Sequence, residues 1–170
     1  MDLWVMDADG KNQKQLTSDS GVNIFPMPSP DGRFIAFDSN RGGTPTVFNV
    51  WRVGIDGSNP RQITSGEGEY FPGFSADGKS ILYTLISAGG APGLWKIPAD
   101  GGDPVELINR VALRPATSPD GKWIACASTG DQPSSGLKIA IFPAEGGQPT
   151  KVLDIPANQQ VQHRWSSDGK

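Results

Sequence analysis

The chain has 170 residues, with 15 Lys and Arg against 18 Asp and Glu, and its net charge of -3 is spread along the sequence with both signs interspersed. It therefore lacks the basic stripe on which nucleic-acid binding depends. No apolar run approaches the ~18 residues of a transmembrane helix, so no membrane insertion is expected.

The chain reads as a series of repeats that together form a single domain over residues 1–170. The N-terminal residues lack the basic and long apolar regions of a signal peptide, so none is expected. In chain order, the repeats are a partial one over residues 1–22, complete ones over 23–68, 69–110 and 111–157, and a partial one over 158–170.

A Ser-x-Asp-Gly motif recurs between the first and second predicted strands of each repeat. It begins at Ser29, Ser75, Ser118 and Ser166, so the copies start 46, 43 and 48 residues apart. The aspartate caps local amides and the glycine takes a positive φ at no steric cost. The predicted structural turns are therefore formed by Asp31, Gly32, Asp77, Gly78, Asp120, Gly121, Asp168 and Gly169.

A second pattern supplies the third and fourth strands of each repeat. An apolar run that carries Trp4, Trp51 or Trp95 ends in an Asp-Gly pair, and a shorter apolar patch follows. Such runs bounded by turn residues are typical of strands, and no stretch keeps helical spacing. Four strands at a period of 40 to 50 residues are typical of the antiparallel blades of a β-propeller.

The fold class predicted is therefore all-β, a β-propeller with three complete blades and partial blades at both ends. A blade buries its faces only against neighbouring blades. We expect the second-strand residues Ile35, Ile81 and Ile124, and the aligned Phe37, Tyr83 and Cys126, to lie between blades, together with the recurring tryptophans. About fifteen strands are expected, the last one being the first strand of a further repeat.

The motifs Ser-Pro-Asp-Gly-Arg/Lys-x-Ile-Ala, Leu-Trp-x-x-x-x-Asp-Gly and Gln-Leu-Thr resemble the TolB-type propeller repeat, which is similar to the WD repeat. The resemblance implies a bacterial, periplasmic, non-enzymatic scaffold for a protein partner or a ligand, in envelope assembly or as a sensor domain. An alternative is the substrate-gating propeller of a prolyl-oligopeptidase-like serine peptidase. Carbohydrate or metal binding in the central channel is a third possibility. Propellers of the TolB type form closed rings of about six blades, so the resemblance also implies that this chain is a partial ring. The uncovered faces of its terminal blades are then expected to drive self-association.

The residues that could act in catalysis are better explained as packing residues. His163 is the single histidine and aligns with Pro26, Pro72 and Pro115, and no Gly-x-Ser-x-Gly elbow is present. Cys126 occupies a core position and has no metal-ligand spacing around it. We therefore expect no catalytic residue, no metal and no cofactor.

The longer loops connect the second strand to the third, and the fourth strand to the next repeat. In an up-and-down sheet these loops lie at one end of the blades, opposite the tight Asp-Gly turns. Because recognition usually lies on longer loops of a rigid scaffold, that end is the predicted binding face. Its candidate residues are Arg41, Glu67, Glu69, Arg110 and Arg114.

Overall fold

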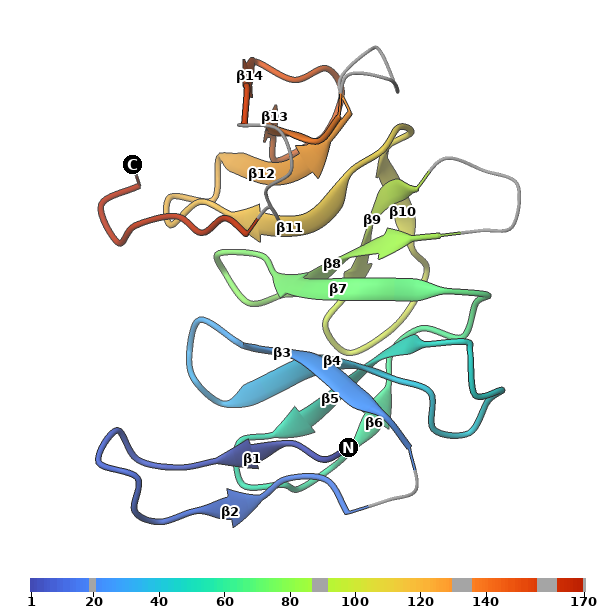
Figure 1. Cartoon of the computed structure of the whole chain (residues 1–170), viewed down its shortest axis with the longest axis vertical. Coiled ribbons are helices and arrows are strands. Elements are labelled where there is room, and N and C mark those ends of the chain that lie inside the picture. Colours follow the sequence, from blue (N-terminus) through green and yellow to red (C-terminus); the bar gives the residue numbers. More distant parts are fainter. Residues whose placement is uncertain (19–20, 87–91, 130–135, 156–161, 170) are drawn as a thin grey trace.

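A computed structural model describes residues 1–18, 21–86, 92–129, 136–155 and 162–169. All regular elements in these residues are β-strands, grouped in four antiparallel sheets that follow one another along the molecule (Figure 1). The predicted all-β fold of antiparallel blades is therefore confirmed. None of the described residues belongs to a helix that is long and apolar enough to cross a membrane.

The sheets are named blades I to IV in chain order. Blade I contains β1 (Trp4–Val5) and β2 (Lys14–Gln15). Blade II contains β3 (Asn23–Pro28), β4 (Phe34–Ser39), β5 (Asn49–Gly54) and β6 (Arg61–Gln62). Blade III contains β7 (Glu69–Phe74), β8 (Ser80–Leu85), β9 (Gly93–Pro98) and β10 (Val105–Ile108). Blade IV contains β11 (Leu113–Thr117), β12 (Trp123–Ser128), β13 (Lys138–Pro143) and β14 (Lys151–Leu153).

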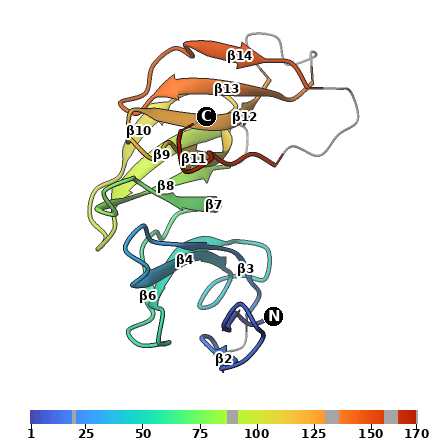
Figure 2. The same ribbon diagram turned by 90° about the vertical axis from the view of Figure 1, so that its left-hand side faces the viewer.

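Each complete blade is a meander in which consecutive strands pair, so the first strand is at one edge and the fourth at the other. The first strands β3, β7 and β11 contact one another in turn and form the inner wall of the stack (Figures 1 and 2). Gly73 allows one of these approaches, because a Cβ there would lie 2.9 Å from the backbone oxygen of Pro115.

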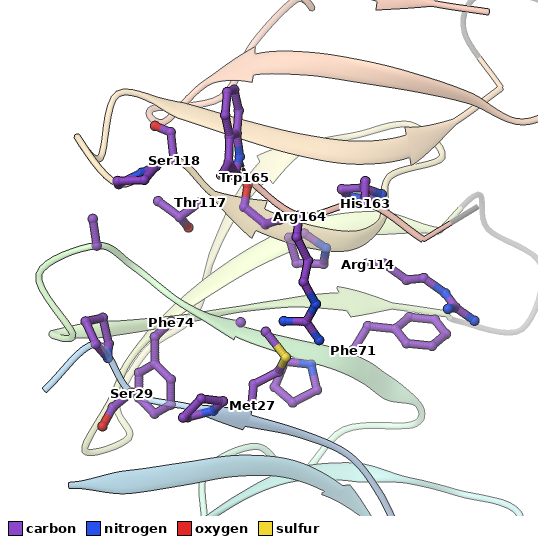
Figure 3. Close-up of a pocket in the computed structure, with 18 of the residues that line it drawn as sticks. Met27, Ser29, Phe71, Phe74, Arg114, Thr117, Ser118, His163, Arg164 and Trp165 are labelled. Atoms are coloured by element: carbon purple, nitrogen blue, oxygen red, sulfur yellow. Dashed lines mark hydrogen bonds between the residues drawn. The ribbon is translucent and has the colours of Figure 1, made fainter. Parts of the chain in front are cut away.

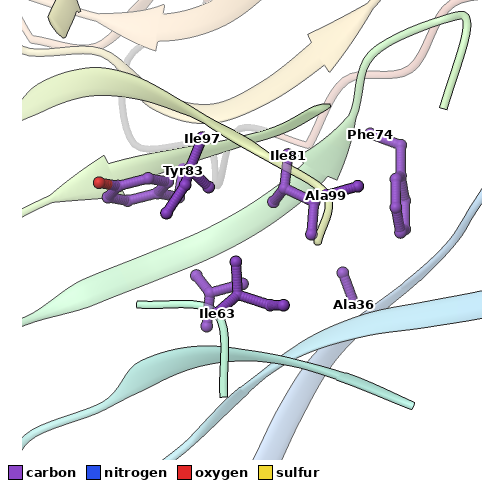
Figure 4. Close-up of a cluster of buried hydrophobic side chains, with 8 residues drawn as sticks. Ala36, Ile63, Phe74, Ile81, Tyr83, Ile97 and Ala99 are labelled. Atoms are coloured by element: carbon purple, nitrogen blue, oxygen red, sulfur yellow. The ribbon is translucent and has the colours of Figure 1, made fainter. Parts of the chain in front are cut away.

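The apolar core lies between the blades, as the repeat pattern predicts. Ile81 and Tyr83 of blade III pack against Val50 and Ile63 of blade II in one such layer (Figure 4). Two similar layers join blades I and II and blades III and IV. The aligned residues Ile35, Ile81, Ile124, Phe37, Tyr83 and Cys126 are all buried in these layers.

Two expectations about the ends of the chain are wrong. Trp4 is exposed, because it lies on the uncovered face of blade I, whereas Trp51 and Trp95 are half-buried in the layers between blades. The described part of the last repeat, residues 162–169, forms no strand. This C-terminal segment lies against β11 and β12 (Figure 1), with Trp165 Nε1 donating to Ala116 O at 2.9 Å. It forms no ladder with any strand that the structure describes.

The Ser-x-Asp-Gly turns have the same hydrogen bonds in blades II, III and IV. In the turn of blade IV, Ser118 Oγ donates to Asp120 Oδ1 at 2.6 Å and accepts from Trp123 N at 3.0 Å. Gly121 has a φ of 71°, a left-handed value that other residues seldom adopt. The serine hydroxyl is the main reason that the pKa of Asp120 lies below its usual value.

Ser118→Ala tests the importance of this buried hydroxyl, because it leaves Trp123 N–H without its acceptor. We expect the free energy of unfolding to fall by about 1–3 kcal/mol in urea titrations followed by tryptophan fluorescence. Ser58→Ala is the matched control, since Ser58 donates to Asp56 Oδ1 at the same 2.6 Å but is exposed. Equal losses in the two variants would contradict the structural importance of the Ser-x-Asp-Gly turn.

Candidate functional site

A groove of about 890 Å³ runs along the inner wall of the stack (Figure 3). It is lined by residues of β3, β7 and β11, by the turns that follow these strands, and by the C-terminal segment. It therefore corresponds to the wall of the central channel of a propeller, where the inner strands of successive blades meet.

The same backbone irregularity occurs once in each inner strand at the groove. Phe25, Phe71 and Arg114 have φ values of 51°, 58° and 56°, and each is followed by a proline. The pairing register shifts at these positions in β3, β7 and β11. Bulges of this kind redirect a side chain, and left-handed values at non-glycine residues are uncommon. The fold thus places one side chain per blade at equivalent points of the groove.

These three side chains contact one another. The rings of Phe25 and Phe71 meet edge to face with centroids 4.8 Å apart. The guanidinium carbon of Arg114 lies 4.9 Å from the centroid of Phe71 and 5.5 Å from that of Phe25. A cation over aromatic faces at this distance is stabilised by the ring quadrupoles. The cluster joins blades II, III and IV at the groove wall.

A buried carboxyl holds one of the bulges in place. Asp38, on β4, is fully buried, and its Oδ2 accepts a hydrogen bond from Phe71 N at 2.9 Å. Its Oδ1 has no hydrogen-bond partner among the described residues. Burial raises the pKa of Asp38 to about 8, although the bond from Phe71 opposes the rise. The carboxyl is therefore mostly protonated at neutral pH, which limits the cost of burying it.

The groove has a positive charge on a chain that is negative overall. Its charged lining residues are Arg114 and Arg164, and no Asp or Glu is found among the described residues that line it. The side chain of Arg164 points into the groove in Figure 3. Neither arginine is in an ion pair with a described carboxylate. Their N–H groups are available to an anionic ligand.

The free edges of the inner strands are poor templates for strand addition. Pro26, Pro28, Pro72 and Pro115 lie on these edges, and proline has no N–H to donate. Strand addition along these edges is therefore disfavoured. The groove combines two guanidinium groups with the apolar side chains of Phe25, Met27, Phe71 and Phe74. Such a lining suits a ligand that carries carboxylates next to apolar side chains.

The predicted loop-face residues do not form one cluster. Glu69 is buried, which corrects its assignment to an exposed face: its Oε2 accepts from Asn49 Nδ2 at 2.6 Å and from Thr64 Oγ1 at 3.0 Å. Arg41 is half-buried, with its guanidinium 4.9 Å from the ring of Trp51 and 3.0 Å from Asn23 Oδ1. Both side chains join strands within the stack.

The other three candidates lie in separate places. Glu67 is exposed in the loop before β7. Arg110 donates to Gln148, in the turn between β13 and β14, at 2.9 Å. Arg114 lies on an inner strand, in the groove. Of the five candidates, the groove includes Arg114 alone.

His163 and Cys126 have the packing environments that the sequence suggests. His163 Nε2 lies 3.0 Å from the backbone oxygen of Ala125, and burial lowers the pKa of the imidazole. Cys126 is fully buried, and burial raises the pKa of its thiol to about 12. At neutral pH the thiol is therefore protonated and a poor nucleophile.

Sequence reasoning missed four residues of the site: Phe25, Phe71, Asp38 and Arg164. The first two could have been found, because Phe-Pro recurs in register with Arg114-Pro115 along the inner strands. Asp38 carries no such signal, since its partner Phe71 lies 33 residues away on another blade. The position of Arg164 depends on how the C-terminal segment packs.

Comparison with known proteins supports the fold and the repeat pattern. The family model of the TolB beta propeller domain matches residues 1–97. An uncharacterised protein of Agrobacterium fabrum is 39% identical over 88 residues, which cover 51% of this chain and 29% of that protein. The Tol-Pal system protein TolB of Anaeromyxobacter dehalogenans is 33% identical over 114 residues, which cover 66% of this chain and 25% of that protein. The chain thus spans less than a third of either relative.

Solved structures share the fold at lower identity. A putative TolB from Agrobacterium tumefaciens has a TM-score of 0.74 at 20% identity, covering 89% of this chain and 55% of that one. TolB from Acinetobacter baumannii has a TM-score of 0.70 at 21% identity, covering 90% and 38%. An oligogalacturonate lyase in complex with manganese has a TM-score of 0.68 at 15% identity, covering 92% and 43%. The same fold therefore occurs in proteins of different activity.

Proposed function

Because the chain belongs to the TolB β-propeller domain family, we propose that it is a non-enzymatic scaffold that binds an acidic segment of a protein partner. The binding site is the groove along the inner strands. We place the protein in the bacterial periplasm, where it serves in envelope assembly or as the sensing part of a membrane-anchored regulator. We also expect copies of the chain to associate through the exposed faces of blades I and IV.

The observation that carries this proposal is the charge of the groove. Arg114 and Arg164 face a space with no carboxylate among the described residues that line it, although the chain as a whole has a net charge of -3. A pocket lined by one sign of charge attracts and orients a ligand of the opposite sign. The aromatic cluster of Phe25 and Phe71 supplies the apolar contacts that a polypeptide needs for affinity.

A peptide is favoured over a sugar by the chemistry of the lining. Sugar hydroxyls need many hydrogen-bonding side chains, whereas prolines and aromatic residues make up much of the wall. The hydroxyls of Ser29 and Ser118 are already bonded to Asp31 and Asp120 in their own turns. These two hydroxyls are therefore not free to bind a neutral sugar.

Selection from a random displayed peptide library tests the proposed function. We expect the selected peptides to be rich in Asp and Glu, and their binding, measured by fluorescence anisotropy, to weaken as salt rises. Replacing both Arg114 and Arg164 by Glu should weaken binding by at least tenfold, about 1.4 kcal/mol. Arg164 is exposed, so Arg164→Glu alone keeps the test valid if the double variant fails to fold.

The matched control reverses two charges outside the groove. Arg61→Glu combined with Lys151→Glu changes the net charge by the same amount, and both residues are exposed on outermost strands. This variant should bind the selected peptides as well as the natural chain does. Equal weakening in both double variants, or selected peptides with no acidic bias, would overturn the proposal.

A further inference from the structure

A row of aromatic side chains continues from one end of the groove toward the loop that precedes β5. Phe71 and Arg114 lie at that end of the groove, and Ser118 lies toward the other (Figure 3). Tyr70 is next to Phe71 in β7, and the centroids of their rings are 6.1 Å apart. The ring of Phe48 follows, with its centroid 5.7 Å from that of Tyr70. Phe48, Tyr70 and Phe71 form what we call the aromatic row.

The two outer rings of the aromatic row lie beyond the residues that line the groove. Tyr70 and Phe48 are both half-buried, so part of each ring is open to solvent. The Tyr70 hydroxyl donates to the backbone oxygen of Thr46, in the loop before β5, at 3.4 Å. This distance is long for an O–H···O hydrogen bond. The hydroxyl can therefore turn toward a carbonyl oxygen of a ligand at little cost.

The charge of the surface changes between the groove and the aromatic row. Arg114 and Arg164 make the groove positive. The loop that leads into Tyr70 instead carries the exposed Glu67, and the rings of the row have no charge. Charge complementarity therefore orders the residues of a ligand that crosses both surfaces. Its carboxylates lie on the arginines, and its uncharged side chains lie on the row.

The wall of the groove also restricts the backbone conformation of a bound segment. Prolines in β3, β7 and β11 remove N–H donors from the inner edges, which disfavours a β-ladder. A polyproline II segment has no internal hydrogen bonds and keeps its backbone solvated, so it needs no ladder. Its stiffness lowers the entropy cost of binding, and proline-rich segments of this kind bind in aromatic-lined grooves. The wall and the row together favour such a segment over a strand.

We propose that the partner segment binds in the polyproline II conformation, with acidic residues against Arg114 and Arg164 and neighbouring prolines on the rings of Tyr70 and Phe48. This inference rests on the proposed function, because it uses the same groove. It adds the composition of the bound segment and a contact outside the groove. The binding site then extends from the inner strands to the loop end of the blades.

Two labelled peptides of equal length and charge test the composition. One has a short run of glutamates with prolines on both sides, and in the other alanine replaces every proline. In fluorescence anisotropy the natural chain should bind the proline peptide about tenfold more tightly, because the alanine peptide lacks the two ring contacts. Arg164→Glu should weaken the binding of both peptides, since both carry the same glutamates.

Removal of the outer rings tests where the prolines bind. Replacing both Tyr70 and Phe48 by Ser should reduce the affinity for the proline peptide to that for the alanine peptide, and should leave the affinity for the alanine peptide unchanged. Tyr70→Phe keeps the ring and should keep most of the preference for proline. Trp4→Ser is the matched control, because it removes an exposed aromatic ring outside the groove and the row. It should bind both peptides as the natural chain does.

The outcomes separate this inference from the proposed function. Equal affinity of the natural chain for the two peptides, with both weakened by Arg164→Glu, would overturn the polyproline II segment and leave the acidic ligand in place. A preference for proline that survives in the folded double variant would overturn the contact with the aromatic row. Binding that does not respond to Arg164→Glu, or no binding of either peptide, would overturn both proposals. The peptide comparison uses the natural chain, so it decides the composition even if the double variant does not fold.

Discussion

The Asp38→Asn variant should be more stable than the natural chain at pH 9, and the two should have similar stability near pH 4. In the natural protein, burial raises the pKa of Asp38 to about 8, from 3.8 in an exposed chain. Asparagine keeps an oxygen that can accept from Phe71 N but never carries a charge. The difference at high pH is expected to be about 6 kcal/mol, because the two pKa values differ by about four units and each unit corresponds to about 1.4 kcal/mol.

The direction of the change in stability with pH follows from the protons bound by the folded and the unfolded chain. Between about pH 4 and pH 8 the folded chain keeps a proton on Asp38 that the unfolded chain has released. Stability of the natural chain therefore falls as pH rises through this window and levels off above it. Urea titrations at pH 4, 6, 8 and 9 should show the decline in the natural chain, whereas Asp38→Asn lacks this contribution.

Two further variants separate this effect from a general response to pH. Asp77 is exposed, and the hydroxyl of Ser75 is the main reason that its pKa is lowered, so Asp77→Asn should remove stability above pH 4 instead of adding it. Asp38→Thr copies the next blade, where the buried Thr84 Oγ1 donates to Ala112 O at 2.9 Å. A natural chain whose stability rises from pH 4 to pH 8, parallel to that of Asp38→Asn, would contradict the protonated buried carboxyl.

Phe37→Ala should lower the free energy of unfolding by about 3–5 kcal/mol, the usual range for removing a buried aromatic side chain. Phe37 is fully buried between blades I and II, beside Val53 and Leu3. Removal of the ring leaves a cavity in a layer that both blades share. Chemical unfolding followed by circular dichroism measures the loss.

Trp4→Ala is the control for the size of the side chain. It also removes an aromatic ring, but Trp4 is exposed, so its effect should lie within about 0.5 kcal/mol. The control is measured at a concentration where the chain is monomeric. A small loss for Phe37→Ala, or a loss for Trp4→Ala of the same size, would mean that the blades do not stabilise one another through this layer.

The repeats made the blades and their core predictable from sequence. Ile81 and Tyr83 were placed between blades because equivalent apolar residues recur at the same distance from each Ser-x-Asp-Gly turn, and both are buried there. Local hydrogen bonds define these turns, as in Ser75 Oγ to Asp77 Oδ1 at 2.6 Å. Interactions between residues close in the sequence, repeated at the same spacing, can therefore be recognised from the sequence alone.

The groove was less predictable because it depends on contacts between blades. Glu69 was predicted to lie on the binding face at the loop end, yet Asn49 and Thr64 enclose its carboxylate. Arg114 was predicted on the same face, but its position on an inner strand, over the rings of Phe25 and Phe71, was not foreseen. The sequence around a charged residue has no periodic pattern that distinguishes a loop position from a bulge in a strand.

Hydrogen exchange of the chain, with and without a selected acidic peptide, is the most direct test of binding at the inner strands. The amides of residues 25–28, 71–74, 114–117 and 162–165 that have an N–H should exchange more slowly in the complex, since these stretches line the groove. The amides of the outermost strands β6, β10 and β14 should exchange as in the free chain. Slower exchange confined to the outermost strands or to the loops between β4 and β5, with no change along the inner strands, would contradict the account.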